Sequence, residues 1–202
     1  MIITISGNPG SGKDTVAKII SKKLGMKLYQ MGKLRRDLAK KHKMSIQELN
    51  EIGKTENWTD TEIDNITAEL GKNEDNFIIV GRTSYHFISH SVKVYLDVDL
   101  KEACRRIMQD RSNRKDEVIS KTVKKEMELV KERFIGDNQR YLKHYGIDIT
   151  DKNNYDIWID TTPIRAEQVA DQIIKFIKIH ITERVTQALR NNNHEPKDYP
   201  SK

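Results

Sequence analysis

The sequence contains little cysteine, proline or aromatic residue, and no long apolar run. Its 202 residues include one cysteine, four prolines and 6% aromatic residues. The single cysteine, Cys104, excludes an internal disulfide framework and a paired-cysteine metal site, which favours a reducing compartment. No apolar run approaches the ~18 residues that span a bilayer, and the N-terminal MIITISG lacks the basic stretch and cleavage site of a signal peptide. We therefore expect a cytoplasmic globular protein with no membrane partner.

Charged residues, in contrast, are abundant. They form 33% of the chain, with a net charge of +6 and a pI of about 9.2. A basic balance is typical of nucleic-acid binding, of a site that holds several phosphates, or of a lysine-rich solvated surface. Charge alone does not choose among these. No aromatic-rich strand face is predicted, so nucleic acid is not expected as a partner.

Short apolar runs alternate with stretches of helical periodicity. The first run, residues 1–6, opens into a glycine-rich turn, and helical spacing follows from Thr15 to Leu24. Further strands are predicted at residues 26–29, 77–80, 92–96 and 155–159, with a closing helix from about residue 166. Strands that alternate with helices predict an α/β fold with a parallel five-stranded sheet flanked by helices.

Two helical stretches, residues 33–72 and 100–145, are too long for simple crossovers and are expected to extend beyond the core. Ser45 and Thr59, each followed by a glutamate three residues later, are predicted N-caps in capping boxes. The second stretch is predicted to break near residues 112–113 and near Gly136. We predict a single domain over residues 1–190 and a disordered tail over 191–202, which is polar, contains two prolines and has no periodicity.

A phosphate-binding loop is predicted between the first strand and the first helix. Residues 7–15 read GNPGSGKDT, which fits G-x-x-x-x-G-K up to Lys13. The glycines let backbone N–H groups face an anion, and the helix N-terminus adds positive charge. The alternative, an ordinary glycine-rich turn, is disfavoured by the Gly-Lys pair after an N-terminal strand. The loop predicts a P-loop NTPase-type fold and ATP binding by Gly7, Asn8, Pro9, Gly10, Ser11, Gly12, Lys13, Asp14 and Thr15.

Asp14 occupies the position at which such a loop normally has a serine or threonine that binds Mg²⁺. Its carboxylate is predicted to hold Mg²⁺, the cofactor expected with ATP, through a water molecule. The alternative is a first-turn acid that only favours the helix dipole. Thr15 is expected to take over the phosphate hydrogen bond, and Asp97, at the end of the fourth strand, is the rival residue for the metal.

Motifs of other phosphate-loop and kinase classes are missing from the sequence. It has no N/T-K-x-D motif of Ras-type GTPases, no H-R-D or D-F-G of protein kinases, and no strand that ends in Asp-Glu. The residues beyond the loop include MGKLRR at 31–36 after the second strand, Gly81-Arg82 after the third, and Arg133, Asp137 and Arg140 on one helix face. With these residues, the chain resembles the nucleoside monophosphate (NMP) kinases over about residues 1–178, most closely the archaeal-type cytidylate (CMP) kinases.

The resemblance implies an NMP-binding insertion at about residues 33–72 and a lid region at about 112–145. The CMP-binding residues that it implies are Gly32, Arg36, Gly81, Arg82, Arg133, Asp137 and Arg140. In this assignment the arginines hold the phosphates and Asp137 holds the ribose. Lys13, Arg133 and Arg140 would be catalytic, and Arg106 would flank the ATP adenine.

Four further positions qualify this assignment. Val80 stands where the family has an acid before its Gly-Arg step. Asp60 and Asp64 resemble a stretch that could read the base. Arg35 is expected on the solvated surface, as is usual for a single arginine on a charged helix.

The activity implied is ATP-dependent phosphorylation of CMP and dCMP. The acceptor phosphate is already mostly ionised at neutral pH because its second pKa is about 6, so the reaction needs no strong general base. The alternatives are a kinase for UMP or AMP and a P-loop ATPase that acts as a switch or assembly factor. Whether the protein is a monomer or a dimer is left open.

Overall fold

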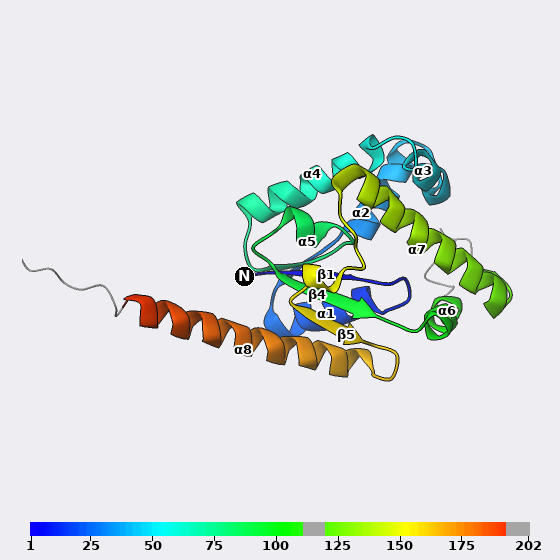
Figure 1. Cartoon of the computed structure of the whole chain (residues 1–202). Coiled ribbons are helices and arrows are strands. Elements are labelled where there is room, and N and C mark those ends of the chain that lie inside the picture. The colour runs from blue at the N-terminus through cyan, green and yellow to red at the C-terminus, as the bar shows by residue number, and fades with distance from the viewer. Residues whose placement is uncertain (111–119, 193–202) are drawn as a thin grey trace, which may run out of the picture.

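The computed structural model, which describes residues 1–110 and 120–192, contains a five-stranded sheet whose strands are all parallel (Figure 1). The strands are β1 (Ile2–Gly7), β2 (Lys27–Gln30), β3 (Phe77–Val80), β4 (Val92–Asp97) and β5 (Ile157–Asp160). Their order is β2-β3-β1-β4-β5, so β1, whose residues are all buried, is central. This confirms the predicted α/β fold. β5 begins two residues later than expected, after a short 3-10 turn (Lys152–Asn154).

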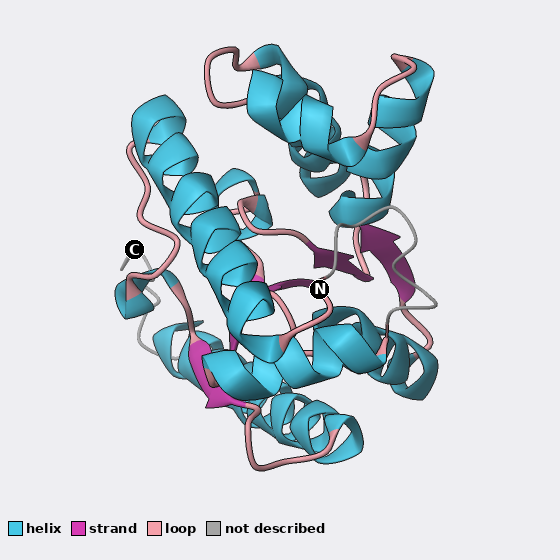
Figure 2. Ribbon diagram, turned by 90° about the vertical axis from the view of Figure 1, so that its right-hand side faces the viewer, coloured by secondary structure: helices cyan, strands magenta, loops and turns pink. Residues whose placement is uncertain are grey.

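Helices cover both faces of the sheet (Figures 1 and 2). α1 (Lys13–Leu24) and α8 (Ala166–Asn192) lie together on one face, and α4 (Trp58–Asn73) and α5 (Ser84–Phe87) lie on the other. The connections at the carboxyl ends of the strands face α6 (Leu100–Gln109) and α7 (Val123–Tyr145). This edge of a parallel sheet is where ligands bind in doubly wound folds.

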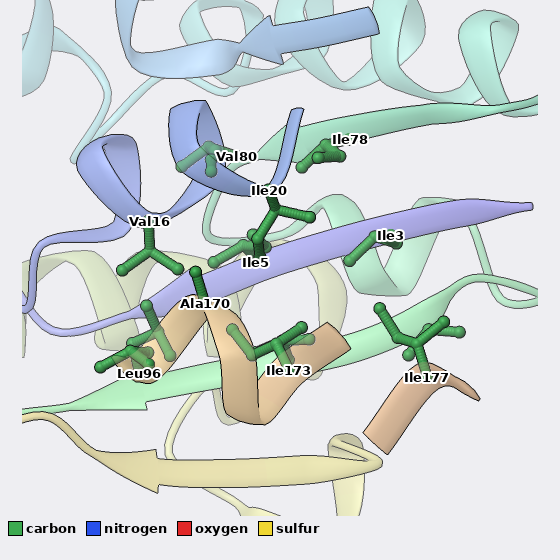
Figure 3. Close-up of a cluster of buried hydrophobic side chains, with 14 of the residues drawn as sticks. Ile3, Ile5, Val16, Ile20, Ile78, Val80, Leu96, Ala170, Ile173 and Ile177 are labelled. Atoms are coloured by element: carbon green, nitrogen blue, oxygen red, sulfur yellow. The ribbon is translucent and has the colours of Figure 1, made fainter. Parts of the chain in front are cut away.

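Apolar side chains fill the space between the sheet and each helical layer. On one face, strand residues pack against Val16, Ile20, Ala170, Ile173 and Ile177 of α1 and α8 (Figure 3). On the other face a second buried cluster surrounds Phe77 and Ile79 of β3. β3, which is buried along its whole length, is accordingly a continuous apolar run, Phe77–Val80, rather than an alternating sequence.

The first predicted insertion folds as three helices, α2 (Met31–Lys41), α3 (Ile46–Ile52) and α4. Ser45 caps α3 in a capping box with Glu48, as predicted. The predicted cap at Thr59 is wrong. α4 begins at Trp58 with Asn57 at the N-cap position, and Thr59 is buried inside the first turn, where its hydroxyl cannot cap the helix.

The predicted break of the second insertion at Gly136 is also wrong, because α7 is continuous over its 23 residues. A glycine in a helix costs only about 1 kcal/mol relative to alanine, and buried residues on either side, Val130 and Tyr141, hold α7 against the protein. The break predicted near 112–113 lies outside the described residues. α8 continues to Asn192, so the first two residues of the predicted tail are helical; residues 193–202 lie outside the described part.

Within residues 1–110 and 120–192, no helix is both long enough and apolar enough to span a membrane.

Candidate active site

The predicted phosphate loop connects β1 to α1. Gly7 lies so close to β4 that a Cβ added to it would stand 2.1 Å from the carbonyl oxygen of Leu96, and Gly10 has φ +79. Only glycine meets both requirements without strain. The Lys13 ammonium donates to the carbonyl oxygens of Gly7 at 2.9 Å and Asn8 at 2.7 Å. The loop therefore curls around the lysine at the N-terminus of α1.

Two clefts meet at this loop. The inner cleft, about 180 Å³ in volume, is lined by Pro9, Gly10, Lys13 and Asp14 of the loop and by residues of α2, α4 and α7. The outer cleft, about 710 Å³, is lined by Gly10, Ser11, Gly12 and Thr15 and by residues of α6 and of the β5–α8 connection. The loop thus lies between two spaces and lines both of them.

Positive side chains concentrate in the inner cleft. Its lining includes Gly32, Gly81, Asp137 and five arginines, Arg35, Arg36, Arg82, Arg133 and Arg140. All of the residues predicted to bind CMP are therefore brought together here, from α2, the end of β3 and α7. Arg36 makes no hydrogen bond or ion pair with any residue that the structure describes, so its charge is available to a ligand.

Two buried aspartates hold three of these arginines in place. The Asp60 carboxylate pairs with Arg35 at 2.6 Å and with Arg140 at 2.8 Å. Asp137 pairs with Arg140 at 2.9 Å and also with Arg82. Removing one member of a buried ion network leaves the others uncompensated, so these contacts fix the guanidinium groups before a ligand arrives.

Basic side chains outnumber acidic ones in the inner cleft, where Lys13 and the five arginines are accompanied by Asp14, Asp60, Asp64 and Asp137. Burial and, second to it, the nearby charge of Arg133 together lower the pKa of the Arg82 guanidinium to about 10. Arg82 nevertheless remains charged at neutral pH. An anion with two or more charges would relieve the repulsion between these arginines, and their forked groups suit phosphate oxygens.

Arg35 was not predicted for this site, and its expected solvated position is wrong. Its guanidinium donates to the Asn50 side chain at 3.1 Å, to the Thr59 carbonyl at 2.9 Å and to Asp60. A signal existed in the sequence. Arg35 lies four residues after Met31 and three before Leu38, both buried, so it shares the inward face of α2.

Asp64 lies deeper in the inner cleft, one helical turn after Asp60 on α4. Its carboxylate accepts hydrogen bonds from the Thr83 hydroxyl at 3.0 Å and the Tyr145 hydroxyl at 2.5 Å. Burial raises the pKa of this carboxyl to about 6 from the ordinary value of 3.8, although the two hydrogen bonds oppose the shift. A buried acid with remaining lone pairs at a cleft is a candidate for ligand recognition.

We expect Asp64→Asn to stabilise the protein above pH 6. A raised pKa means that the folded state binds the proton more tightly than the unfolded state, so stability is lost as the pH rises from about 4 to 6. The shift corresponds to about 1–3 kcal/mol, and the variant escapes this loss because the Thr83 and Tyr145 hydroxyls can also accept from its amide. Urea unfolding at pH 4.5, 6 and 7.5 measures the difference. If the free energies of unfolding of the variant and the wild type differed by the same amount at all three pH values, ionisation of Asp64 would not be the cause of the difference.

Asp14, the residue predicted to reach a metal, points from the first turn of α1 into the inner cleft beside Lys13. It is exposed, and its carboxylate accepts a hydrogen bond from the Gln30 amide at 2.6 Å. Within the described ranges, no group of three or more His, Cys, Asp or Glu could hold a metal ion. A lone carboxylate fits Mg²⁺, which keeps several waters and takes its other ligands from phosphates.

Arg106, predicted beside the adenine, lines the outer cleft in α6. Its guanidinium is fixed by Glu102 at 2.8 Å and by the carbonyl oxygen of Thr161 at 2.7 Å. The Thr161 hydroxyl has two acceptors within reach, the Asp97 carbonyl oxygen at 2.8 Å and the Ser11 carbonyl oxygen of the loop at 3.2 Å. The position of this planar cation is therefore tied to the phosphate loop, and its face is suited to stacking on a base.

Comparison with known proteins agrees with this geometry. The profile of the cytidylate kinase-like family matches residues 2–163. A cytidylate kinase from Sulfolobus acidocaldarius is 37% identical over 180 residues, which cover 88% of this chain and 94% of that protein. An S-adenosylmethionine-dependent nucleotide dehydratase from Lacinutrix mariniflava is 36% identical over 175 residues, which cover 86% of this chain and 35% of that protein.

Solved structures agree on the fold. A shikimate kinase from Bacteroides thetaiotaomicron has a TM-score of 0.60 and 16% identity to this chain, with coverage of 88% of this chain and 98% of that one. At this level of identity the similarity shows the fold alone, which is that of the P-loop kinases.

Proposed function

The chain belongs to the cytidylate kinase-like family and is a nucleotide phosphotransferase, and we propose that it transfers the γ-phosphate of ATP to CMP, giving ADP and CDP, with dCMP as a second acceptor. The observation that carries the proposal is the phosphate loop between two clefts, one of which holds five arginines. Two anionic nucleotides can approach each other only if their charges are neutralised where they meet.

We assign ATP to the outer cleft and CMP to the inner cleft. Loop residues 7–15 would bind the ATP phosphates, and Arg106 would stack on the adenine. In the inner cleft, Arg36 and Arg82 would hold the CMP phosphate and Asp137 the ribose. Arg133 and Arg140 lie on the α7 face that lines the inner cleft, where they would contact the transferring group.

Catalysis in this scheme depends on position and charge rather than on a base. The acceptor oxygen is already ionised, so Lys13, Arg133 and Arg140 need only align the reactants and neutralise the charge of the transferring group. Bound Mg²⁺ would neutralise further phosphate charge, and Asp14 would hold it through a water. Each arginine stays charged throughout, so no proton has to move on the protein.

We further propose that α3 and α7 approach each other when both nucleotides are bound. A cavity of about 270 Å³ separates these helices and shares Pro9, Arg133 and Arg140 with the inner cleft. Its closure would remove water, the competing acceptor, from the phosphate-transfer path. This assigns the NMP-binding role to the α2–α4 insertion and the lid role to α7.

Asp64 is the residue we assign to base recognition, with Asp60 fixing the neighbouring arginines. The Asp64 carboxylate is charged above about pH 6 and retains acceptor capacity beyond the bonds from Thr83 and Tyr145. It would accept a hydrogen bond from the exocyclic amino group of cytosine. Uracil presents a carbonyl oxygen at that position, which the carboxylate repels, so the cleft should favour CMP over UMP.

A screen of nucleoside monophosphates, read as ADP release, tests the function. We expect strong dependence on CMP, weaker turnover of UMP and AMP, and little ATP hydrolysis without acceptor. Asp64→Asn should lower kcat/KM for CMP by about 10²-fold and reduce the preference for CMP over UMP. Glu62→Gln, on the same helix but outside the cleft, is the matched control. If the rate of ADP release were the same with and without each acceptor, the protein would instead be an ATPase that acts as a switch.

The metal assignment is tested at Asp14. If Asp14 holds Mg²⁺ through water, Asp14→Asn should raise the Mg²⁺ concentration for half-maximal rate by about 10-fold or more, the usual cost of losing an outer-shell contact. Asp14→Thr should keep or improve activity, since threonine restores the usual ligand. An unchanged Mg²⁺ titration in the Asn variant would show that Asp14 acts only through the helix dipole.

A further inference from the structure

Three consecutive residues at the end of β4 hold the second residue of the phosphate loop, Asn8. The Tyr95 hydroxyl donates to the Asn8 side-chain oxygen, and the Asn8 amide nitrogen donates to the Asp97 carboxylate at 2.6 Å. Between them, the Leu96 carbonyl oxygen accepts from the Asn8 backbone N–H at 3.1 Å. Both ends of the Asn8 amide and its backbone donor are therefore bound by one strand.

Tyr95 and Asp97 are themselves fixed by Trp158 of β5. The Trp158 ring stacks on the Tyr95 ring with centroids 3.7 Å apart and an interplanar angle of 14°. Its indole N–H donates to Asp97 at 3.3 Å, and the backbone N–H of Val98 donates to the same carboxylate at 2.8 Å. Asp97 thus already has three donors, so we assign it to this network rather than to a metal.

The network reaches the lysine of the loop. The carbonyl oxygen of Asn8 accepts from the Lys13 ammonium at 2.7 Å, so rotation of Asn8 would move the lysine's partner. Tyr95 and Asp97 do not line the inner or the outer cleft. The hydrogen bonds that their side chains make to the phosphate loop both go to the Asn8 side chain.

We propose that Tyr95 and Asp97 are positioning residues that hold Asn8, and through it Lys13, in the conformation that binds the β- and γ-phosphates of ATP. The inference rests on the proposed ATP site. A loop ordered in advance does not lose conformational entropy when the phosphates arrive. Without the Tyr95 hydroxyl, the ring and its stack on Trp158 remain, but the phosphates must order the loop themselves.

Tyr95→Phe tests the proposal because it removes a single oxygen. We expect the dissociation constant for ADP and the KM for ATP to rise by about 3- to 10-fold, the effect of losing one hydrogen bond. The dissociation constant for CMP should change by less than about 2-fold. If Tyr95 had a purely structural role, its loss would weaken the binding of ADP and of CMP to the same extent. Titration calorimetry with ADP alone and with CMP alone measures the two dissociation constants separately.

Tyr85→Phe is the matched control. Tyr85 is similarly buried and, like Tyr95, packs against the Tyr155 ring, but its hydroxyl contacts Asn154, at 3.4 Å, and Tyr155 rather than the phosphate loop. The Tyr85→Phe variant should bind ADP and CMP with unchanged affinity. If Tyr95→Phe unfolds the protein, Asp97→Asn, which keeps the shape of the side chain, should weaken ADP binding in the same way.

A double-mutant cycle completes the test. Asn8→Ala removes the partner of Tyr95, so adding Tyr95→Phe to it should weaken ADP binding no further. Tyr95→Phe with wild-type ADP affinity, or with an undiminished effect in the Asn8→Ala background, would overturn the inference. A wild-type protein that binds CMP but not ADP would overturn the ATP site, and this inference with it.

Discussion

Lys13→Ala should lower kcat for phosphoryl transfer by at least about 10³-fold, as expected when a preorganised positive group is removed from a developing charge. The Lys13 ammonium is held by two loop carbonyls at the N-terminus of α1, where both clefts meet. The fold should persist. The side chain lies outside the hydrophobic core, and alanine is the best helix former, so the free energy of unfolding should change by less than about 1 kcal/mol.

The matched control for Lys13 is Lys18→Ala, an exposed lysine on the same helix. It removes the same charge from α1 without touching either cleft, and its turnover should equal that of the wild type. Steady-state kinetics with saturating ATP and CMP, together with thermal unfolding, separate the two variants. Near-normal turnover in Lys13→Ala would show that the phosphate loop lysine takes no part in phosphoryl transfer.

The second large effect is expected at Arg140. Its side chain is 5% exposed and is the only described cation that pairs with both Asp60 and Asp137. Arg140→Ala leaves those carboxylates buried without their shared partner, which should cost about 3–5 kcal/mol of stability. The KM for CMP should rise by about 10²-fold, whereas the KM for ATP should change little, because Arg140 lines the inner cleft and not the outer cleft.

Arg36→Ala separates binding from stability. Arg36 lines the same cleft but has no ion partner among the described residues, so its loss should raise the KM for CMP without lowering the melting temperature. Chemical unfolding and acceptor titrations on both variants give the comparison. If Arg140→Ala raised the KM values for CMP and ATP equally, Arg140 would not belong to the acceptor site.

The sheet and the phosphate loop could be predicted because their signals are local. A buried parallel strand is a short β-branched run, and the loop requires glycine and lysine at fixed spacing. Arg82 could be placed because it follows the third strand, and Arg140 because its spacing from Arg133 and Asp137 puts the three on one helix face and resembles the family's pattern. The errors at Thr59 and Gly136 arose where a local preference competed with tertiary packing: one residue was buried in a helix, and the other lay in a helix held by its neighbours.

The buried polar contacts could not be predicted, because they join residues far apart in the chain. Asp64 meets Tyr145 across 81 positions, and Asn8 meets Asp97 across 89. No sequence pattern specifies which hydroxyl a buried carboxylate will meet. The inward position of Arg35 is an intermediate case. The helical spacing contained the information, but a charged residue on a charged helix is ordinarily solvated.

The central position of β1 also has a consequence for how the chain is made. Ile3 pairs with Ile78 on one side and with Val92 on the other, so β1 cannot be paired on both sides until β3 and β4 have both been synthesised. At bacterial or eukaryotic translation rates, that delay is on the order of 5–20 s. Until then at least one edge of this apolar strand is unpaired, which favours chaperone contact, and pairing between distant segments slows folding. Since the phosphate loop takes shape only when β4 lies beside β1, nucleotide can protect the finished protein but cannot assist the nascent one.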